Sequence, residues 1–125
     1  PCIQHILPAN SILPTGSAHA EGKLVLGDPA QIHKLEDAGC IALRYCNSAA
    51  QATLDYPDCP NGSEGGIAGL VSPSGRILGL MPHPERCISA ESLPDRGSCA
   101  WGDGTAGIEF FKGLLSPYLT PACAQ

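Results

Sequence analysis

His83 and Glu85, a histidine and a carboxylate two residues apart, form the stretch of this sequence best suited to chemistry. They follow an apolar run from Ile77 to Met81 that is typical of a buried strand, and a proline precedes each of them. Pro82 and Pro84 fix φ and favour extended backbone at the residues before them. Because side chains at i and i+2 of an extended backbone point the same way, we predict that Glu85 faces His83. A carboxylate in that position would set the tautomer and orientation of a catalytic imidazole.

This pair also has interpretations that do not involve catalysis. A His-x-Glu pair at the end of a strand is often only solvated surface, although sites in α/β sheets gather at the carboxyl ends of strands. A second pair with the same spacing, His19 and Glu21, lies upstream. The four side chains could converge on a metal ion, with Cys87 as a spare ligand. The chain could also be a non-catalytic docking module.

The composition limits the classes of protein to which this chain can belong. Its 125 residues leave room for one domain with a modest core, and the 43% hydrophobic content favours a folded chain. The net charge of −5, with only seven Lys and Arg residues, argues against nucleic acid as a partner. No apolar run reaches membrane-spanning length, and the first residues lack the pattern of a signal peptide. We therefore expect a cytoplasmic protein that binds neither nucleic acid nor membranes.

The seven cysteines are numerous for this length, but none has the context of a nucleophile. There is no Cys-x-x-Cys pair, so neither a zinc ribbon nor a redox motif is indicated. None lies in a glycine-flanked turn between a strand and a helix, where a thiol would be exposed. We therefore expect reduced thiols, several of them packed as small apolar side chains. The cysteines are Cys2, Cys40, Cys46, Cys59, Cys87, Cys99 and Cys123.

Local signals predict the elements of the first half of the chain. Asp28 can cap a helix whose first turn holds Pro29, and Gly39 is typical of a helix end. Ile32, Leu35 and Ala38 would give this helix a buried stripe. We predict a strand from Lys23 to Leu26, a helix from Asp28 to Gly39, a strand from Cys40 to Cys46 and a loop from Asn47 to Gly66.

The second half is predicted to hold a hairpin and a final helix. Both hairpin strands are apolar at nearly every position, so we expect both of their faces to be buried. The final helix shows an apolar stripe at i, i+3 and i+7, and Pro117 is expected to stop it. We predict strands from Ile67 to Ser72 and from Ile77 to Met81, a loop from Cys87 to Gly104 and a helix from Thr105 to Ser116 with the stripe Ile108, Phe111 and Leu115.

Several segments together resemble a known family. The sequence holds Ala-His-Ala-Glu-Gly at 18–22, Pro-Asn-Gly-Ser at 60–63 and Pro-His-Pro-Glu at 82–85, in that order. In combination these segments resemble the glutaminase component of phosphoribosylformylglycinamidine synthase, a class I (triad-type) glutamine amidotransferase of purine synthesis. Gly75 to Arg86 matches most closely. Two positions depart from the family pattern, because Ala20 replaces a Gly and Cys59 replaces an Asn. The similar segments are Leu13 to Lys23, Pro60 to Gly69, Gly75 to Arg86 and Gly102 to Phe111.

The resemblance implies a fold and a place within it. The family has an open, mostly parallel, flavodoxin-like α/β sheet with helices on both faces. It carries a cysteine nucleophile on a strand-to-helix elbow in its first half, and that elbow has no counterpart in this sequence. The resemblance therefore implies that residues 1–125 are the C-terminal portion of one glutaminase domain, without the N-terminal half. We expect the isolated chain to be inactive.

The resemblance also implies roles for the two His-x-Glu pairs. His83 would promote attack of the missing cysteine on the glutamine carboxamide and protonate the leaving ammonia, and Glu85 would orient His83. His19 and Glu21 would lie on a loop near that site and support it or the partner interface. No cofactor is expected in this chain. ATP and Mg would bind to the partner, a formylglycinamide ribonucleotide synthetase subunit or domain that uses the ammonia.

Overall fold

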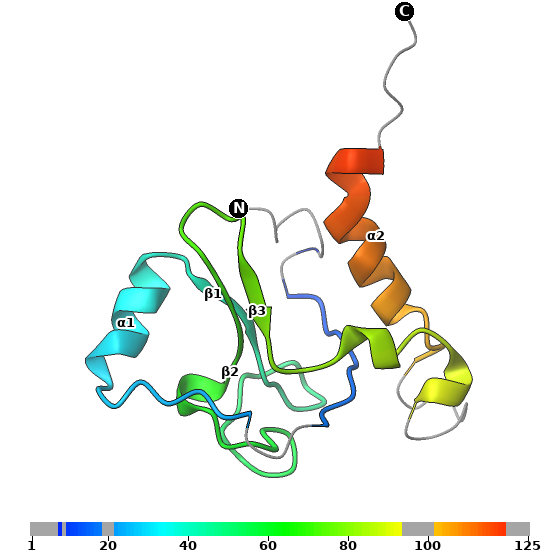
Figure 1. Cartoon of the computed structure of the whole chain (residues 1–125). Helices are drawn as coiled ribbons and strands as arrows, with labels where there is room; N and C mark the ends of the chain where they lie inside the picture. The colour runs from blue at the N-terminus through cyan, green and yellow to red at the C-terminus, as the bar shows by residue number, and fades with distance from the viewer. Residues whose placement is uncertain (1–7, 9, 19–21, 94–101, 120–125) are drawn as a thin grey trace, which may run out of the picture. The chain divides into compact units, whose positions relative to one another are not determined.

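The computed structural model describes residues 8, 10–18, 22–93 and 102–119, which belong to two compact units (Figure 1). The first unit extends from Ser17 to His83, and the second combines residues up to Gly16 with those from Pro84 onward. Among the described residues, no helix has both the length and the apolar character needed to cross a membrane. His19, Glu21 and Trp101 lie outside the described residues.

A three-stranded sheet forms the centre of the first unit (Figure 1). Its strands are β1 (Ile41–Arg44), β2 (Ile67–Val71) and β3 (Leu78–Leu80), in the order β1-β2-β3. Both neighbouring pairs are antiparallel. A short turn joins β2 to β3, and such a turn can connect only antiparallel strands. The predicted hairpin is confirmed, whereas the described strands do not include the mostly parallel sheet that the resemblance implies.

Burial in the sheet is concentrated on its middle strand. In β2, Ile67 is 1% exposed on one face and Ala68 is 3% exposed on the other, so the prediction of a strand buried on both faces is correct there. The prediction is wrong for the second hairpin strand, where Gly79 is exposed and Ile77 is 70% exposed. β3 lies at an edge of the described sheet and has one strand neighbour instead of two. Tyr45, Cys59 and Ala68 form the buried cluster beside the sheet.

The helix α1 (Ala30–Asp37) lies within the predicted range of Asp28 to Gly39 and is two residues shorter at each end. The Asp28 carboxylate accepts a hydrogen bond from the Ala30 N–H at 2.9 Å. Gly39 has a φ of +62° and donates its N–H to the Glu36 carbonyl at 2.9 Å, a geometry that favours glycine after a helix. The prediction of a buried stripe is wrong, because Ile32 and Leu35 are only half-buried, Ala38 is exposed and no residue of α1 is buried.

Residues Lys23 to Leu26 do not form the predicted strand. The Leu24 N–H donates to Ser63 Oγ at 3.0 Å, and the Leu26 N–H donates to the Glu64 carboxylate at 2.9 Å. The Leu24 carbonyl accepts the Glu64 N–H at 3.0 Å. Side-chain oxygens thus accept hydrogen bonds from two backbone N–H groups that, in a sheet, would donate to a neighbouring strand.

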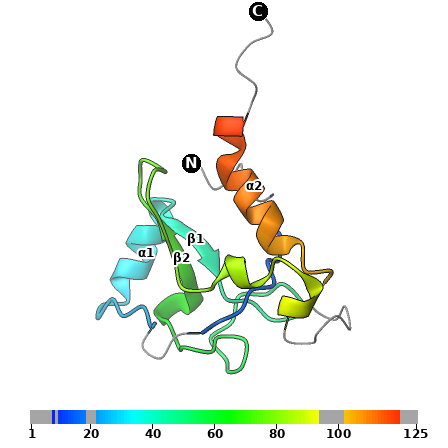
Figure 2. The ribbon, with the colours of Figure 1, turned by 45° about the vertical axis from the view of Figure 1, so that its right-hand side comes forward.

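The second unit contains the short 3-10 turns η3 (Pro84–Arg86) and η4 (Ala90–Ser92) and the helix α2 (Ala106–Leu119) (Figure 2). The predicted start of this helix is confirmed, but the prediction that Pro117 stops it is wrong. Pro117 has no N–H to donate to the carbonyl of Gly113, four residues earlier. That carbonyl accepts the Ser116 hydroxyl at 2.8 Å instead, and the helix continues to Leu119.

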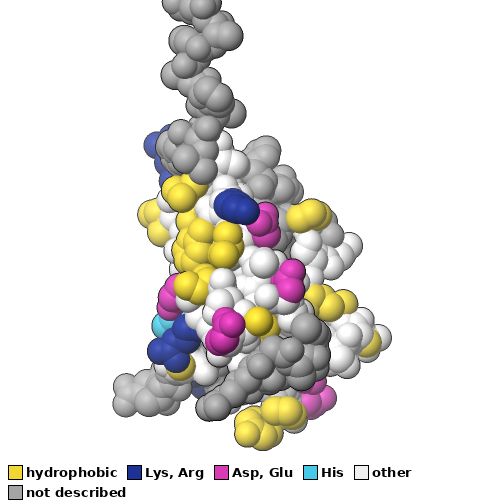
Figure 3. Space-filling model, turned by 90° about the vertical axis from the view of Figure 1, so that its right-hand side faces the viewer, with side chains coloured by type: hydrophobic (Ala, Val, Ile, Leu, Met, Phe, Trp, Pro, Cys, Tyr) yellow, Lys and Arg dark blue, Asp and Glu magenta, His cyan; other side chains and the backbone are white. Residues whose placement is uncertain are grey.

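Helix α2 is apolar on two sides. Phe110 is 2% exposed and forms the buried side together with Gly107. The stripe that predicted the helix lies on an exposed side, with Ile108 37%, Phe111 36% and Leu115 48% exposed. Figure 3 shows hydrophobic side chains grouped on the surface of this unit. The i, i+3, i+7 pattern therefore predicted the helix correctly without identifying the face that it buries.

Candidate functional site

The two residues of the predicted catalytic pair fall in different units. His83 is half-buried and ends the first unit, three residues after β3, and Glu85 is exposed in η3 of the second unit. The Cys87 N–H donates to the Pro84 carbonyl at 3.0 Å, so the backbone around Glu85 is a tight turn. The expectation of extended backbone through Glu85 is therefore wrong. The pairing of the Glu85 carboxylate with the imidazole of His83 stays a prediction, but it no longer follows from an extended backbone.

Backbone contacts hold the turn that carries Glu85. The Gly107 N–H donates to the Cys87 carbonyl at 2.8 Å. A Cβ atom at Gly107 would lie 2.0 Å from the Pro84 carbonyl oxygen and 2.6 Å from that of Cys87. Neither distance is compatible with a side chain, so only glycine lets the start of α2 lie against this turn. The glycines of the Gly102 to Phe111 segment thus have a structural role next to Glu85.

Gly104 makes a second close approach in the same unit. A Cβ atom there would lie 2.2 Å from the Ser89 carbonyl carbon, and Gly104 has a φ of +80°. The next residue, Thr105, donates its N–H and its hydroxyl to the Asp103 carboxylate at 3.0 and 2.6 Å. These two hydrogen bonds, that of the Thr105 side chain first, lower the pKa of the Asp103 carboxyl below its usual value. Asp103 thus fixes the residue that precedes α2.

Cys87, the cysteine nearest to the predicted pair in sequence, is not arranged as a nucleophile. Its side chain is 1% exposed. Burial raises the pKa of the Cys87 thiol, a hydrogen bond from the Gly16 backbone lowers it by less, and the charge of Glu85 adds a still smaller rise. A thiol with a raised pKa holds little of the reactive thiolate at neutral pH. Of the other described cysteines, Cys40 and Cys59 are also buried.

A polar pair in the first unit, the buried Tyr45 and the half-buried Asn61, was not identified from the sequence. The Asn61 side-chain amide donates to the Tyr45 hydroxyl at 3.0 Å and also to the Gly22 carbonyl. The phenol of Tyr45, 8% exposed, forms a further hydrogen bond with the Ser17 side chain. Burial raises the pKa of Tyr45, and these two hydrogen bonds only partly offset the rise, so the phenol stays protonated. The Asn-Gly turn at 61–62 was visible in the sequence, but its partner, 16 positions away, was not.

The upstream pair, His19 and Glu21, lies outside the described residues, in the gap between Ala18 and Gly22. Its expected place near His83 stays a prediction. The metal alternative needs both of these residues and stays a prediction as well. Within the part of the chain that the structure describes, no three His, Cys, Asp or Glu side chains are grouped to hold a metal ion.

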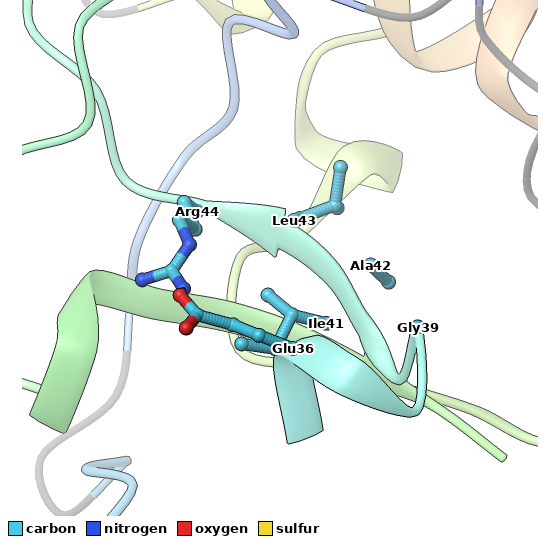
Figure 4. Close-up of a pocket in the computed structure, with 6 residues that line it drawn as sticks. All are labelled: Glu36, Gly39, Ile41, Ala42, Leu43 and Arg44. Atoms are coloured by element: carbon cyan, nitrogen blue, oxygen red, sulfur yellow. The ribbon is translucent and has the colours of Figure 1, made fainter. Parts of the chain in front are cut away.

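An open cavity of about 380 Å³ lies along β1 and the end of α1, away from the predicted site residues in sequence (Figure 4). Arg44 extends across it, donating to the Glu36 carboxylate and to the Gly65 carbonyl. The charge of Arg44 is thus already paired, which leaves little to attract an anionic ligand. The cavity is lined by Glu36, Gly39, Ile41, Ala42, Leu43 and Arg44.

A family model and two curated relatives match most of the chain. Residues 1–115 match the family described as the CobB/CobQ-like glutamine amidotransferase domain. The chain is 40% identical over 108 residues to phosphoribosylformylglycinamidine synthase of Saccharomyces cerevisiae, an alignment that covers 83% of this chain and 8% of that protein. It is 42% identical over 90 residues to the phosphoribosylformylglycinamidine synthase subunit PurQ of Methanothrix thermoacetophila, covering 72% of this chain and 34% of the subunit. The chain thus spans only a minor part of the length of either relative.

Proposed function

Since the chain belongs to the CobB/CobQ-like glutamine amidotransferase family, we propose that it is the part of a glutaminase domain that carries the histidine and glutamate of a Cys-His-Glu triad. The observation that supports this most strongly is the family match over residues 1–115, within which Pro-His-Pro-Glu occupies 82–85. The remaining strands of an open, mostly parallel class I sheet would come from sequence beyond the three described strands.

The chemistry assigns one task to each residue of the pair. A cysteine thiolate, supplied by sequence outside these 125 residues, attacks the carboxamide carbon of glutamine. The imidazolium of His83 gives a proton to the leaving nitrogen, so ammonia departs and a thioester remains. Water, activated by the neutral imidazole, then hydrolyses the thioester to glutamate. Glu85 orients His83 and stabilises its charged form.

The ammonia would serve a synthetase of de novo purine biosynthesis. The names of the two relatives support formylglycinamide ribonucleotide as the acceptor. ATP and Mg would bind at the synthetase partner, and this chain needs no cofactor for thioester chemistry. The relatives exemplify two arrangements, because one is named as a subunit and the other as the synthase itself. The glutaminase can therefore be a separate chain or a part of a long one.

A comparison of two ammonia sources in the enzyme that carries this sequence tests the proposal. His83→Ala should abolish synthesis driven by glutamine and leave synthesis driven by free ammonia unchanged, because free ammonia bypasses the thioester. His33→Ala is a matched control, since the His33 side chain is 80% exposed on α1 and contacts only the nearby Glu36 carboxylate among the described ion pairs. If His83→Ala lowered both activities equally, His83 would be a structural or interface residue and the proposal would be wrong.

A further inference from the structure

The turn at Asn61 and Gly62 has a chemical reactivity that the proposed function does not use. It is the only Asn-Gly pair in the sequence. The backbone nitrogen that follows an asparagine can attack the side-chain carbonyl carbon of that asparagine, which is one reason why asparagine is a thermolabile residue. Glycine has no Cβ atom to hinder the approach. Gly62 is also exposed, so water reaches the turn.

This reaction would replace the Asn61 amide with an acid. The Gly62 nitrogen forms a bond to the Asn61 carbonyl carbon and closes a succinimide ring. The bond from that carbon to Nδ2 breaks, and the proton of the Gly62 N–H leaves with this nitrogen as ammonia. Water then opens either imide C–N bond, which leaves aspartate or isoaspartate at position 61. Water is therefore the only co-reactant.

Hydrogen bonds hold the Asn61 amide in the folded chain. Its oxygen accepts the Ser63 N–H at 3.1 Å. Its nitrogen donates to the Tyr45 hydroxyl at 3.0 Å and to the Gly22 carbonyl. Because the Ser63 N–H requires an acceptor, the oxygen must face it, and the NH₂ group is left to donate its hydrogens to the other two partners. Three stretches of the first unit thus fix the orientation of one side chain.

The phenol of Tyr45 is a firmly held partner for this amide. Its ring packs in the buried cluster with Cys59 and Ala68, beside the sheet. Its hydroxyl forms a further hydrogen bond with the Ser17 side chain. The Asn61 amide therefore cannot turn unless its contacts with Tyr45 and with the backbone at residue 22 break.

These hydrogen bonds oppose the reaction. Attack makes the Asn61 carbonyl carbon tetrahedral and moves its oxygen and nitrogen out of the amide plane, away from their partners. The attacking group is engaged as well, because the Gly62 N–H donates to the Cys59 carbonyl at 3.4 Å. Interactions that are stronger in the ground state than in the transition state slow a reaction. One hydrogen bond of ordinary strength corresponds to about fivefold in rate.

We propose that Asn61 is a deamidation site that the fold of the first unit shields, and that opening of this unit exposes it to a one-way conversion. An aspartate carboxylate has no hydrogen to donate to the Gly22 carbonyl, and isoaspartate lengthens the main chain of the turn. The contact of the amide with Gly22 therefore cannot form again after the conversion. This inference does not depend on the glutaminase assignment, because it uses only the turn and its partners.

A comparison of the folded and unfolded enzyme that carries this sequence tests the shielding without any substitution. The enzyme is incubated at mildly alkaline pH with and without urea, and peptide mass spectrometry follows the conversion at Asn61. We expect conversion to be at least about tenfold slower in the folded enzyme, because more than one hydrogen bond must break before attack. Equal rates in the two conditions would overturn the inference, as would the absence of conversion at Asn61 in urea.

Tyr45→Phe tests the hydrogen bond to the phenol. It keeps the buried ring, removes the hydroxyl and should speed conversion of Asn61 in the folded enzyme about fivefold. Tyr56→Phe is the control, because Tyr56 is 82% exposed, and it should behave as the wild type. Asn47, which Ser48 follows, reports any general loosening. No change at Asn61 in Tyr45→Phe, or an equal acceleration at Asn47, would contradict the proposal. If Tyr45→Phe did not fold, the comparison in urea would decide alone.

Asn61→Asp tests whether the conversion is one-way. The Leu24 and Leu26 N–H groups donate to the Ser63 and Glu64 side chains, next to the turn. Without the bond from position 61 to Gly22, hydrogen exchange of these two amides should be about fivefold faster, while the amides of β2 keep their wild-type rates.

Asn47→Asp is the control for this exchange measurement. It keeps the side-chain oxygen that accepts the Ala49 and Gln51 N–H groups in a surface turn, and it should leave exchange at Leu24 and Leu26 unchanged. Exchange at wild-type rates in Asn61→Asp would show that the acid restores the contacts of the amide, and the conversion would then not be one-way.

Discussion

Gly107 donates its backbone N–H to the carbonyl oxygen of Cys87 at 2.8 Å, and this contact joins the first turn of α2 to the turn that carries Glu85. The close approach depends on the absence of a side chain at position 107, as the 2.0 Å distance from a Cβ atom to the Pro84 oxygen shows. Gly107, which lies outside the predicted triad, therefore fixes the backbone from which the Glu85 side chain extends.

Gly107→Ala should destabilise the second unit and impair glutamine-driven synthesis. The added methyl group must push α2 away from the Pro84–Arg86 turn, at a cost of about 1–3 kcal/mol typical of overpacking. Gly79→Ala is the control, because a Cβ atom at Gly79 would meet nothing within 4 Å. Thermal unfolding of the two variants measures the difference. Equal unfolding midpoints for the two variants would show that α2 shifts to accommodate the methyl group and that the close approach at Gly107 does not constrain the fold.

Glu85→Gln should slow glutamine-driven synthesis without abolishing it. Proton transfer needs the imidazole of His83, whereas a neutral amide or a water can replace part of the orienting role of the carboxylate. We expect residual glutamine-driven turnover in this variant and none in His83→Ala, with ammonia-driven synthesis intact in both. Glu109→Gln is the control, since the Glu109 carboxylate is exposed and pairs with Lys112. Complete loss in Glu85→Gln would assign the carboxylate a role beyond orientation.

Cys87 should react slowly with alkylating reagents, and its replacement should spare catalysis. Because burial raises the pKa of the Cys87 thiol, the folded state favours the neutral form. The corresponding stability is fully present below about pH 8.5, the ordinary thiol value, and is lost as the pH rises through the raised pKa. Mass spectrometry after timed alkylation should show slower labelling at Cys87 than at the half-buried Cys46. Rapid labelling of Cys87 at pH 7, with loss of turnover in Cys87→Ser, would mark it as a nucleophile.

The isolated 125-residue chain should release no ammonia from glutamine. The proposed mechanism requires a thiolate next to His83, and the described cysteines are buried or half-buried structural residues. An ammonia assay with and without a thiol-blocking reagent provides the measurement, and His83→Ala of the same chain provides the background. Release of ammonia that the reagent abolishes would show that the nucleophile lies within these residues.

Elements with local signals could be predicted from the sequence. The start of α1 depends on Asp28 two residues before Ala30, and its end depends on Gly39, so all the partners lie within one stretch. The segment from Lys23 to Leu26 was predicted wrongly because its hydrogen-bond partners lie 38 and 39 positions later in the chain. A local sequence pattern carries no information about hydrogen-bond partners that far along the chain.

The same limit applies to predicting the candidate site from the sequence. His83 and Glu85 could be proposed from the sequence because a short motif holds both of them. The geometry inferred for that motif was wrong at Glu85, since extended backbone and a 3-10 turn are both compatible with proline before glutamate. Tyr45 and Asn61 were missed because only the folded chain brings them together. The end of α2 was missed because the Ser116 hydroxyl replaces the bond that Pro117 cannot make.

The hydrogen bonds between residues 22–26 and 61–64 also have a consequence for the order in which the first unit folds. The β2–β3 hairpin joins residues that are close in sequence, whereas these hydrogen bonds join residues 38 to 40 positions apart. Closing so large a loop costs more chain entropy than forming a hairpin, so contacts of this kind form late. We expect the sheet to assemble first and these hydrogen bonds to form afterwards. On heating, these contacts would then break before the sheet does.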